Sequence, residues 1–132
     1  MEKQILIGDY DDIVPQLIEE ALKNLDYDYT CYHTQDEKST LDLANREKYE
    51  AIFLRNSLPL TPGETYEAAD VGLSLLKKIR EGTLNKDSLI FLMSGDYAKI
   101  SDRAKKYNVT EGIQLPIDLS DFEKILKENL SA

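Results

Sequence analysis

The stretch AIFLRNSLPL, residues 51–60, joins a continuous apolar run to a turn. Residues 51–54 are all apolar, which is typical of a strand covered on both faces of a parallel sheet. Pro59 ends this strand, because proline has no N–H to donate to the hydrogen-bond ladder. Arg55 follows the apolar run directly, so a fixed positive charge is expected where a buried strand ends.

Apolar runs alternate with helical patterns along the rest of the chain. Further strands are expected at residues 4–7, 27–33, 89–93 and 112–115. Apolar residues at helical spacing predict helices over about residues 14–25, 36–48, 73–82, 100–107 and 119–130. Strands and helices that alternate in this way predict an α/β fold, in which a doubly wound parallel sheet carries helices on both faces.

Length and composition indicate a single globular domain. The chain has 132 residues, enough for one continuous core, and an apolar fraction of 42%. No apolar run approaches the about 20 residues that a membrane-spanning helix needs, and the N-terminus has no signal-peptide pattern. We therefore expect a cytoplasmic protein that does not interact with membranes.

The net charge and the lack of known cofactor-binding motifs exclude several classes of function. Acidic residues outnumber basic ones by 25 to 16, and this net charge of −9 should repel nucleic acid and anionic membrane, so a protein is the expected partner. The sequence has no dinucleotide-binding glycine pattern, no P-loop and no cluster of metal ligands, so we expect neither an enzyme nor a cofactor. The single histidine, His33, is expected to be an ordinary surface or edge residue.

The loops that follow the strands contain the candidate site. In a doubly wound sheet, the loops after the carboxyl ends of the strands surround the functional crevice. These loops contain residues 9–12, 55–57, 94–96 and 115–116. Arg55 is therefore expected at the crevice, near the acidic loop of residues 9–12.

Five phrases, in this order, resemble the receiver domain of two-component response regulators, the CheY-like family. They are ILIGDYDD at residues 5–12, YEAIFLRNSLPL at 49–60, DVGLSLLKKIRE at 70–81, LIFLMSG at 89–95 and GIQLPIDLSDF at 112–122. The resemblance covers nearly the whole chain. It implies the flavodoxin-like (βα)5 fold with strand order 2-1-3-4-5, and one receiver-like domain over residues 1–132 without a separate output domain.

The resemblance also implies where the phosphoryl chemistry of receivers would lie. In that family an acidic pair after the first strand binds magnesium, and an aspartate at the end of the third strand accepts phosphate from a histidine kinase. A serine or threonine ends the fourth strand, and a lysine precedes a proline after the fifth. The corresponding residues here are Asp9 and Tyr10, Arg55, Ser94, and Leu115 before Pro116. Only Asp9 and Ser94 match the pattern.

These departures indicate a degenerate receiver, or pseudo-receiver. A guanidinium has no nucleophilic oxygen and stays protonated at physiological pH, so Arg55 cannot accept phosphate. Magnesium prefers carboxylate oxygens, so its binding should be weak or absent beside this cation. We interpret the chain as a phosphorylation-independent interaction module whose partner is a histidine kinase or another signalling protein. Arg55 would form ion pairs with Asp9, and also with Asp11, in place of the metal.

Several alternatives stay open on the sequence alone. A response regulator could still bind metal or accept phosphate through the displaced acids Asp11 or Asp12. A register shift would place Asn56 at the strand end, although an amide is no phosphoacceptor either. Arg55 could instead point into solvent from the rim of the crevice. A flavodoxin-like cofactor binder is disfavoured, because no phosphate loop rich in serine or threonine follows the first strand.

Two further regions are candidates for partner binding. The segment Leu60 to Val71, LTPGETYEAADV, is longer than the matching turn of receivers, and as a lid or docking loop it would present Tyr66. Alternatively, residues 65–70 extend the following helix at its N-terminus. Tyr97 and Tyr107, on or near the fourth helix, are candidates for the partner surface. Gly112 stands where receivers have an aromatic residue in the fifth strand.

Overall fold

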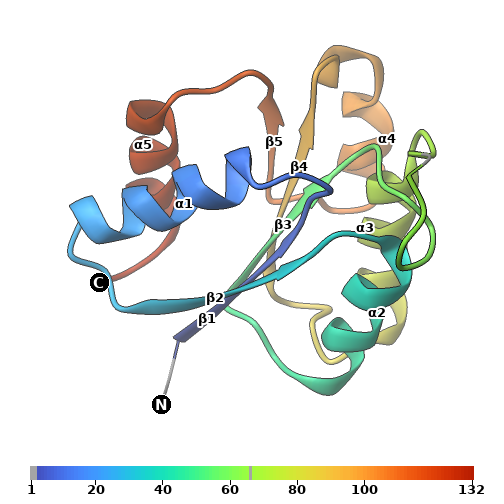
Figure 1. Ribbon diagram of the computed structural model, residues 1–132, viewed down its shortest axis with the longest axis horizontal. Helices are drawn as coiled ribbons and strands as arrows, with labels where there is room; N and C mark the ends of the chain where they lie inside the picture. Colours follow the sequence, from blue (N-terminus) through green and yellow to red (C-terminus); the bar gives the residue numbers. More distant parts are fainter. Residues whose placement is uncertain (1–2, 66) are drawn as a thin grey trace.

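The computed structural model describes residues 3–65 and 67–132, and within them a parallel sheet of five strands forms the centre of the molecule (Figure 1). The strands are β1 (Lys3–Gly8), β2 (Tyr29–Thr34), β3 (Ala51–Arg55), β4 (Leu89–Ser94) and β5 (Glu111–Gln114). They lie in the order β2-β1-β3-β4-β5, and neighbouring strands are parallel. The predicted fold class and strand order are confirmed.

Helices cover both faces of the sheet. They are α1 (Ile13–Asn24), α2 (Glu37–Arg46), α3 (Val71–Gly82), α4 (Ser101–Lys106) and α5 (Leu119–Asn129), with a short 3-10 helix, η1 (Tyr97–Lys99), before α4. Helices α1 and α5 pack on one face, and α2, α3 and α4 pack on the other (Figure 1). Within the described part of the chain, no helix has the length and apolar character needed to cross a membrane.

The central strands are buried on both faces, which explains their unbroken apolar runs. Successive residues of a strand point to opposite faces of the sheet. Phe53 and Phe91 stack with their ring centroids 4.5 Å apart and belong to the core that α1 and α5 cover. Ile52 and Leu54 belong to the core on the opposite face. Each face of the sheet therefore has its own hydrophobic core.

Some element bounds differ from the sequence expectation. The second strand begins at Tyr29 rather than at residue 27, because Tyr27 still closes the end of α1 by donating its N–H to the Leu22 carbonyl at 2.9 Å. Asp26 has a positive φ of 59°, as is common just after a helix end. The fourth helix ends at Lys106, one residue earlier than expected, and it begins only after η1.

The segment between β3 and α3 is a loop and does not extend the helix. Helix α3 begins at Val71, and Asp70 before it has a left-handed φ of 61°. Ala68 pairs with Leu58 in an antiparallel bridge with N···O distances of 2.9 and 3.2 Å. The helix-extension alternative is therefore wrong. Tyr66 lies outside the described residues, so its partner role stays a prediction.

The same loop contacts the N-terminus of α2. The carbonyl oxygens of Pro59 and Leu60 accept hydrogen bonds from the N–H groups of Glu37 and Lys38, at 2.9 and 3.1 Å. These two N–H groups belong to the first turn of α2, where no partner within the helix exists. The loop is thus fixed at its start beside the crevice.

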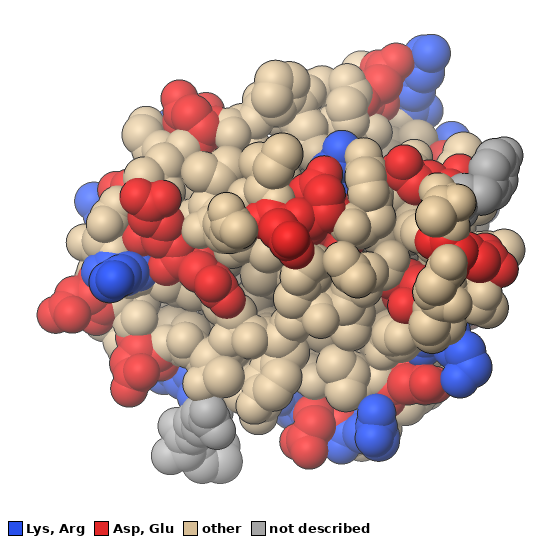
Figure 2. All heavy atoms as spheres, viewed as in Figure 1, with Lys and Arg blue, Asp and Glu red and all other residues tan. Residues whose placement is uncertain are grey.

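Charge is unevenly spread on the face seen in Figure 2. Acidic side chains gather near the middle of this face, whereas most Lys and Arg side chains lie toward its edges. This distribution accords with the net charge of −9.

Candidate functional site

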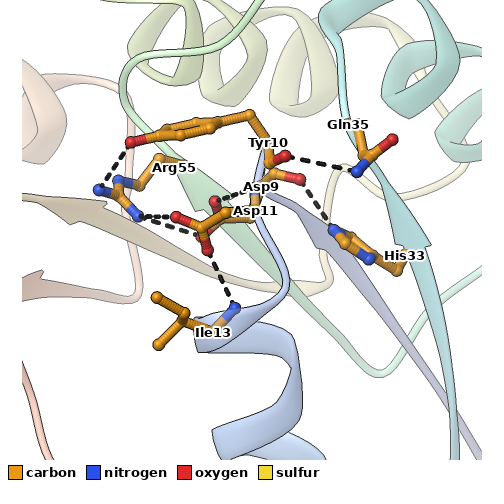
Figure 3. A network of polar contacts seen from close by, with 7 residues as sticks. All are labelled: Asp9, Tyr10, Asp11, Ile13, His33, Gln35 and Arg55. Carbon is orange, nitrogen blue, oxygen red and sulfur yellow. Dashed lines mark hydrogen bonds and ion pairs between the residues drawn. The ribbon is translucent and has the colours of Figure 1, made fainter.

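Asp9 and Arg55 meet at the carboxyl end of the sheet, where β1 and β3 are neighbours (Figure 3). Asp9 follows β1 and is fully buried, while Arg55 ends β3 with 21% of its side chain exposed. Arg55 Nη1 lies 3.4 Å from Asp9 Oδ2 and 4.0 Å from Asp11 Oδ2. The alternative in which Arg55 points into solvent is therefore wrong. The contacts are those of the ion pairs expected from the sequence.

Tyr10 covers the guanidinium from another side. Its ring centroid lies 5.1 Å from Arg55 Cζ, which is within the range of a cation–π interaction, and Arg55 Nη2 donates to Tyr10 Oη at 3.5 Å. Burial raises the pKa of Tyr10 more than the Arg55 charge lowers it, so the phenol is neutral at physiological pH. The sequence comparison identified Tyr10 only as a replacement for an acidic residue, although an aromatic ring can also bind a cation.

Hydrogen bonds within the acidic loop fix the carboxylates. Asp9 Oδ1 accepts from the N–H of Asp11 at 3.2 Å, and Asp11 Oδ1 accepts from the N–H of Ile13 at 3.0 Å. Gln35, which follows β2, donates from its Nε2 to the Tyr10 carbonyl oxygen at a distance of 3.3 Å (Figure 3). The loop therefore holds both carboxylates toward Arg55.

His33 is an exposed residue of the edge strand β2, as expected, and its side chain also contacts the acidic loop. The β1–β2 register places it opposite Ile7, close to the acidic loop. Its Nε2 donates to the Asp9 carbonyl oxygen at 2.8 Å, and its Nδ1 lies 3.7 Å from Asp12 Oδ1. Asp12 itself points outward, with 71% of its side chain exposed. Strand register, which the sequence does not give, is what brings His33 to the loop.

The buried position of Asp9 has a thermodynamic consequence. Burial raises the pKa of Asp9 above its ordinary value of 3.8, against the opposing effects of the Asp11 N–H and the Arg55 charge. A raised pKa means that the folded protein binds this proton more tightly than the unfolded chain does. The ionised carboxylate of Asp9 therefore lowers stability relative to a neutral group of the same shape.

Asp9→Asn is expected to increase the free energy of unfolding at pH 7, because the variant replaces an ionised carboxylate with a raised pKa by a neutral group of similar shape. In the wild type, the stabilisation of the folded state by the protonated Asp9 carboxyl is complete below pH 3.8 and is lost as the pH rises through the folded pKa. The difference in free energy of unfolding between the variant and the wild type should therefore shrink as the pH falls. Urea unfolding of both proteins across this pH range measures the difference. A variant less stable than the wild type at pH 7 would contradict the prediction.

Ser94, Leu115 and Pro116 lie on the other side of the crevice. Ser94 ends β4, and its Oγ accepts from the N–H of Asp96 at 3.1 Å. Leu115 follows β5, is only 7% exposed and joins the core under α1 and α5. With Pro116 it lines a cavity that also reaches Arg55. Apolar side chains therefore occupy the position at which the resemblance to receivers implies a lysine.

The side chain of Asn56 contacts the N-terminus of α3 and not the crevice. It is 7% exposed, its Oδ1 accepts from the N–H of Leu73 at 3.1 Å, and its Nδ2 donates to Asp70 Oδ1 at 3.0 Å. Arg55 is the last residue of β3 and pairs with Met93 in the sheet. The register alternative that places Asn56 at the strand end is therefore wrong. Its cap-like role at α3 was not foreseen.

Tyr97 and Tyr107 are both partly buried. The Tyr97 ring lies against the backbone of Gly112, in space that any side chain at that position would occupy. Burial raises the pKa of Tyr97. Lys77 Nζ lies 5.7 Å from the centroid of the Tyr107 ring. Both tyrosines therefore pack within the fold, and their role in partner binding stays a prediction.

The donor set at the crevice does not fit magnesium. Among the described residues, no group of three or more His, Cys, Asp or Glu side chains could hold a metal ion. Asp9 and Asp11, the two candidate metal ligands, face the guanidinium of Arg55 at 3.4 and 4.0 Å. A divalent cation would have to displace this fixed charge. The expectation of weak or absent magnesium binding stays a prediction.

No protein-family model and no curated protein matches this sequence. Solved structures do share its fold. The chemotaxis response regulator CheY4 of Vibrio cholerae is 17% identical, with a TM-score of 0.77, and the match covers 98% of this chain and 100% of that chain. A response regulator of Thermotoga maritima is 19% identical over 100% of both chains, with a TM-score of 0.74.

A third similar structure is the receiver domain of a sensor histidine kinase from Pseudomonas aeruginosa, with a magnesium ion coordinated in its active-site cleft. It is 17% identical, covers 98% of each chain and has a TM-score of 0.72. Identities at this level establish the fold alone. The chain therefore has the fold of CheY-like response-regulator receiver domains, as its sequence phrases predicted.

Proposed function

We propose that this chain is a phosphorylation-independent, receiver-like module that acts in signal transduction by binding a protein. A histidine kinase or another signalling protein is the proposed partner. The observation that carries the proposal is the guanidinium of Arg55, which lies at the end of β3 within 3.4 Å of the buried Asp9. The receiver fold of the similar structures supports the signalling context.

The residue types at the crevice support the proposal that this chain does not accept a phosphoryl group. Transfer to an aspartate needs a carboxylate nucleophile and a cation that stabilises the charge on the phosphoryl oxygens. At the end of β3, Arg55 supplies a cation but no nucleophile. Leu115 supplies no ammonium group, and Tyr10 supplies no second carboxylate to a metal. We infer that the chain is not an enzyme and that its fixed cation replaces the metal of other receivers.

A second candidate function retains phosphorylation through displaced acids. Asp11 favours it, because a third of its side chain is exposed at the crevice. Asp12 is more exposed, but it lies beside His33. Against this candidate, Asp11 is already within 4.0 Å of Arg55 and accepts the N–H of Ile13.

Acetyl phosphate with magnesium distinguishes the two functions. The purified protein is incubated with this small phosphodonor, and its intact mass is measured. We expect no phosphoryl adduct on the wild type. The triple variant Tyr10→Asp/Arg55→Asp/Leu115→Lys restores the residue types of the family pattern and serves as the matched control, which should gain the adduct. A wild-type adduct that disappears in Asp11→Asn or Asp12→Asn would establish the second function instead.

A further inference from the structure

A cavity of about 310 Å³ opens in the crevice between the start of α1 and the loop after β5. Its walls are mostly apolar and include Val14, Leu17, Leu115 and Ile117. Ile13, which also lines the cavity, is 66% exposed to solvent. A concave apolar surface of this size with a few polar groups is typical of the smaller binding sites for organic molecules.

Two polar groups lie at one end of this cavity. Arg55 and Asp11 both line it, and Figure 3 shows the Asp11 carboxylate between the Arg55 guanidinium and the start of α1 at Ile13. The contacts of Arg55 are long: 3.4 Å to Asp9 and 3.5 Å to Tyr10, against about 2.7 to 2.9 Å for a strong charge-assisted hydrogen bond. The guanidinium therefore keeps donor capacity for a better-placed acceptor.

The charges at this end select the kind of head group. A carboxylate can only accept hydrogen bonds and would be repelled by Asp9 and Asp11, while an ammonium can only donate and would be repelled by Arg55, although the acids attract it. An uncharged group that accepts from Arg55 and donates to Asp11 meets neither penalty. The 4.0 Å between Arg55 Nη1 and Asp11 Oδ2 is too long for a direct hydrogen bond, so a ligand that bonds to both would replace a weak contact.

We propose that this cavity binds a small uncharged molecule with an apolar body and a carboxamide-like head group. The body lies against Val14, Leu17 and Ile117, and the head group hydrogen-bonds to Arg55 and Asp11. Binding removes the apolar walls and part of exposed Ile13 from water, which is the main source of affinity. This site goes beyond the proposed protein-interaction function and does not depend on it.

Methyl NMR spectra with three matched aromatic probes test the site. Benzamide, benzoate and benzylamine have similar bodies and differ in the charge of the head group. Benzamide is expected to shift the methyl signals of Ile13, Val14, Leu17 and Ile117 saturably, with a Kd of about 1 to 10 mM, as fits a ligand of so few atoms. Benzoate and benzylamine should bind at least about fivefold more weakly, because benzoate cannot donate to Asp11, benzylamine cannot accept from Arg55, and each places a charge beside a like charge.

Two variants on neighbouring positions of α1 localise the binding. Leu17→Trp fills the cavity from its wall and should abolish the benzamide shifts, while the Asp9–Arg55 ion pair stays in place. Gln16→Trp adds the same ring at an exposed position that does not line the cavity and should leave the shifts unchanged. The proposal is overturned if benzamide gives no saturable shifts, if the three probes bind equally, or if Leu17→Trp binds benzamide like the wild type.

Discussion

Arg55→Ala is expected to lower the free energy of unfolding at pH 7 by about 2 to 4 kcal/mol. The substitution leaves the fully buried Asp9 carboxylate without its nearest positive charge. The loss should be somewhat smaller than for a completely buried pair, because 21% of the Arg55 side chain is exposed. Urea unfolding measures the difference between variant and wild type.

The pH dependence of this loss identifies its cause. The pKa of Asp9 is already raised in the wild type, and removing Arg55 raises it further. The destabilisation should therefore be largest at neutral pH and shrink as the pH falls through the folded pKa of Asp9. The double variant Asp9→Asn/Arg55→Ala serves as the control and should recover most of the lost stability. A double variant as unstable as Arg55→Ala would show that Arg55 acts mainly through packing.

Gly72→Ala is expected to lower the free energy of unfolding by about 2 to 3 kcal/mol, because the added methyl group has no room. A Cβ at Gly72 would lie 2.8 Å from Asn56 Cα and closer still to the Arg55 carbonyl oxygen. These are backbone atoms, which cannot move aside as the end of a flexible side chain can. Helix α3 would have to shift away from the end of β3, and amide NMR signals of Arg55 should move with it.

Gly82→Ala is the matched control at the opposite end of α3. No heavy atom lies within 4 Å of a Cβ built at Gly82. Alanine is a better helix former than glycine, so stability should be unchanged or raised by up to about 1 kcal/mol. If thermal unfolding shows equal losses for both variants, the close approach of α3 to β3 is not the reason.

Much of the fold follows from local pattern. The apolar run of residues 51–54 and its counterpart at 89–93 predicted buried parallel strands, and both are strands of the central sheet. The meeting of Arg55 with Asp9 was also predictable, because the carboxyl ends of parallel strands share one edge of the sheet. The sequence was less informative at residues 65–70, where acidic residues before a helix suggested that the helix begins earlier. The structure instead has a loop there, with a bridge between Leu58 and Ala68 and a left-handed backbone at Asp70.

Sequence alone determined the residue types at the crevice: a guanidinium at the end of the third strand, an acidic loop after the first, and leucine before Pro116. Only the tertiary structure decided which of these groups touch. Strand register brought His33 to the carbonyl of Asp9, and the space above Gly112 was filled by Tyr97. The side chain of Asn56 points toward α3, and an apolar cavity lies beside Arg55. Residue identity fixes the chemistry available, but contact depends on how distant segments pack, and local periodicity carries no record of that packing.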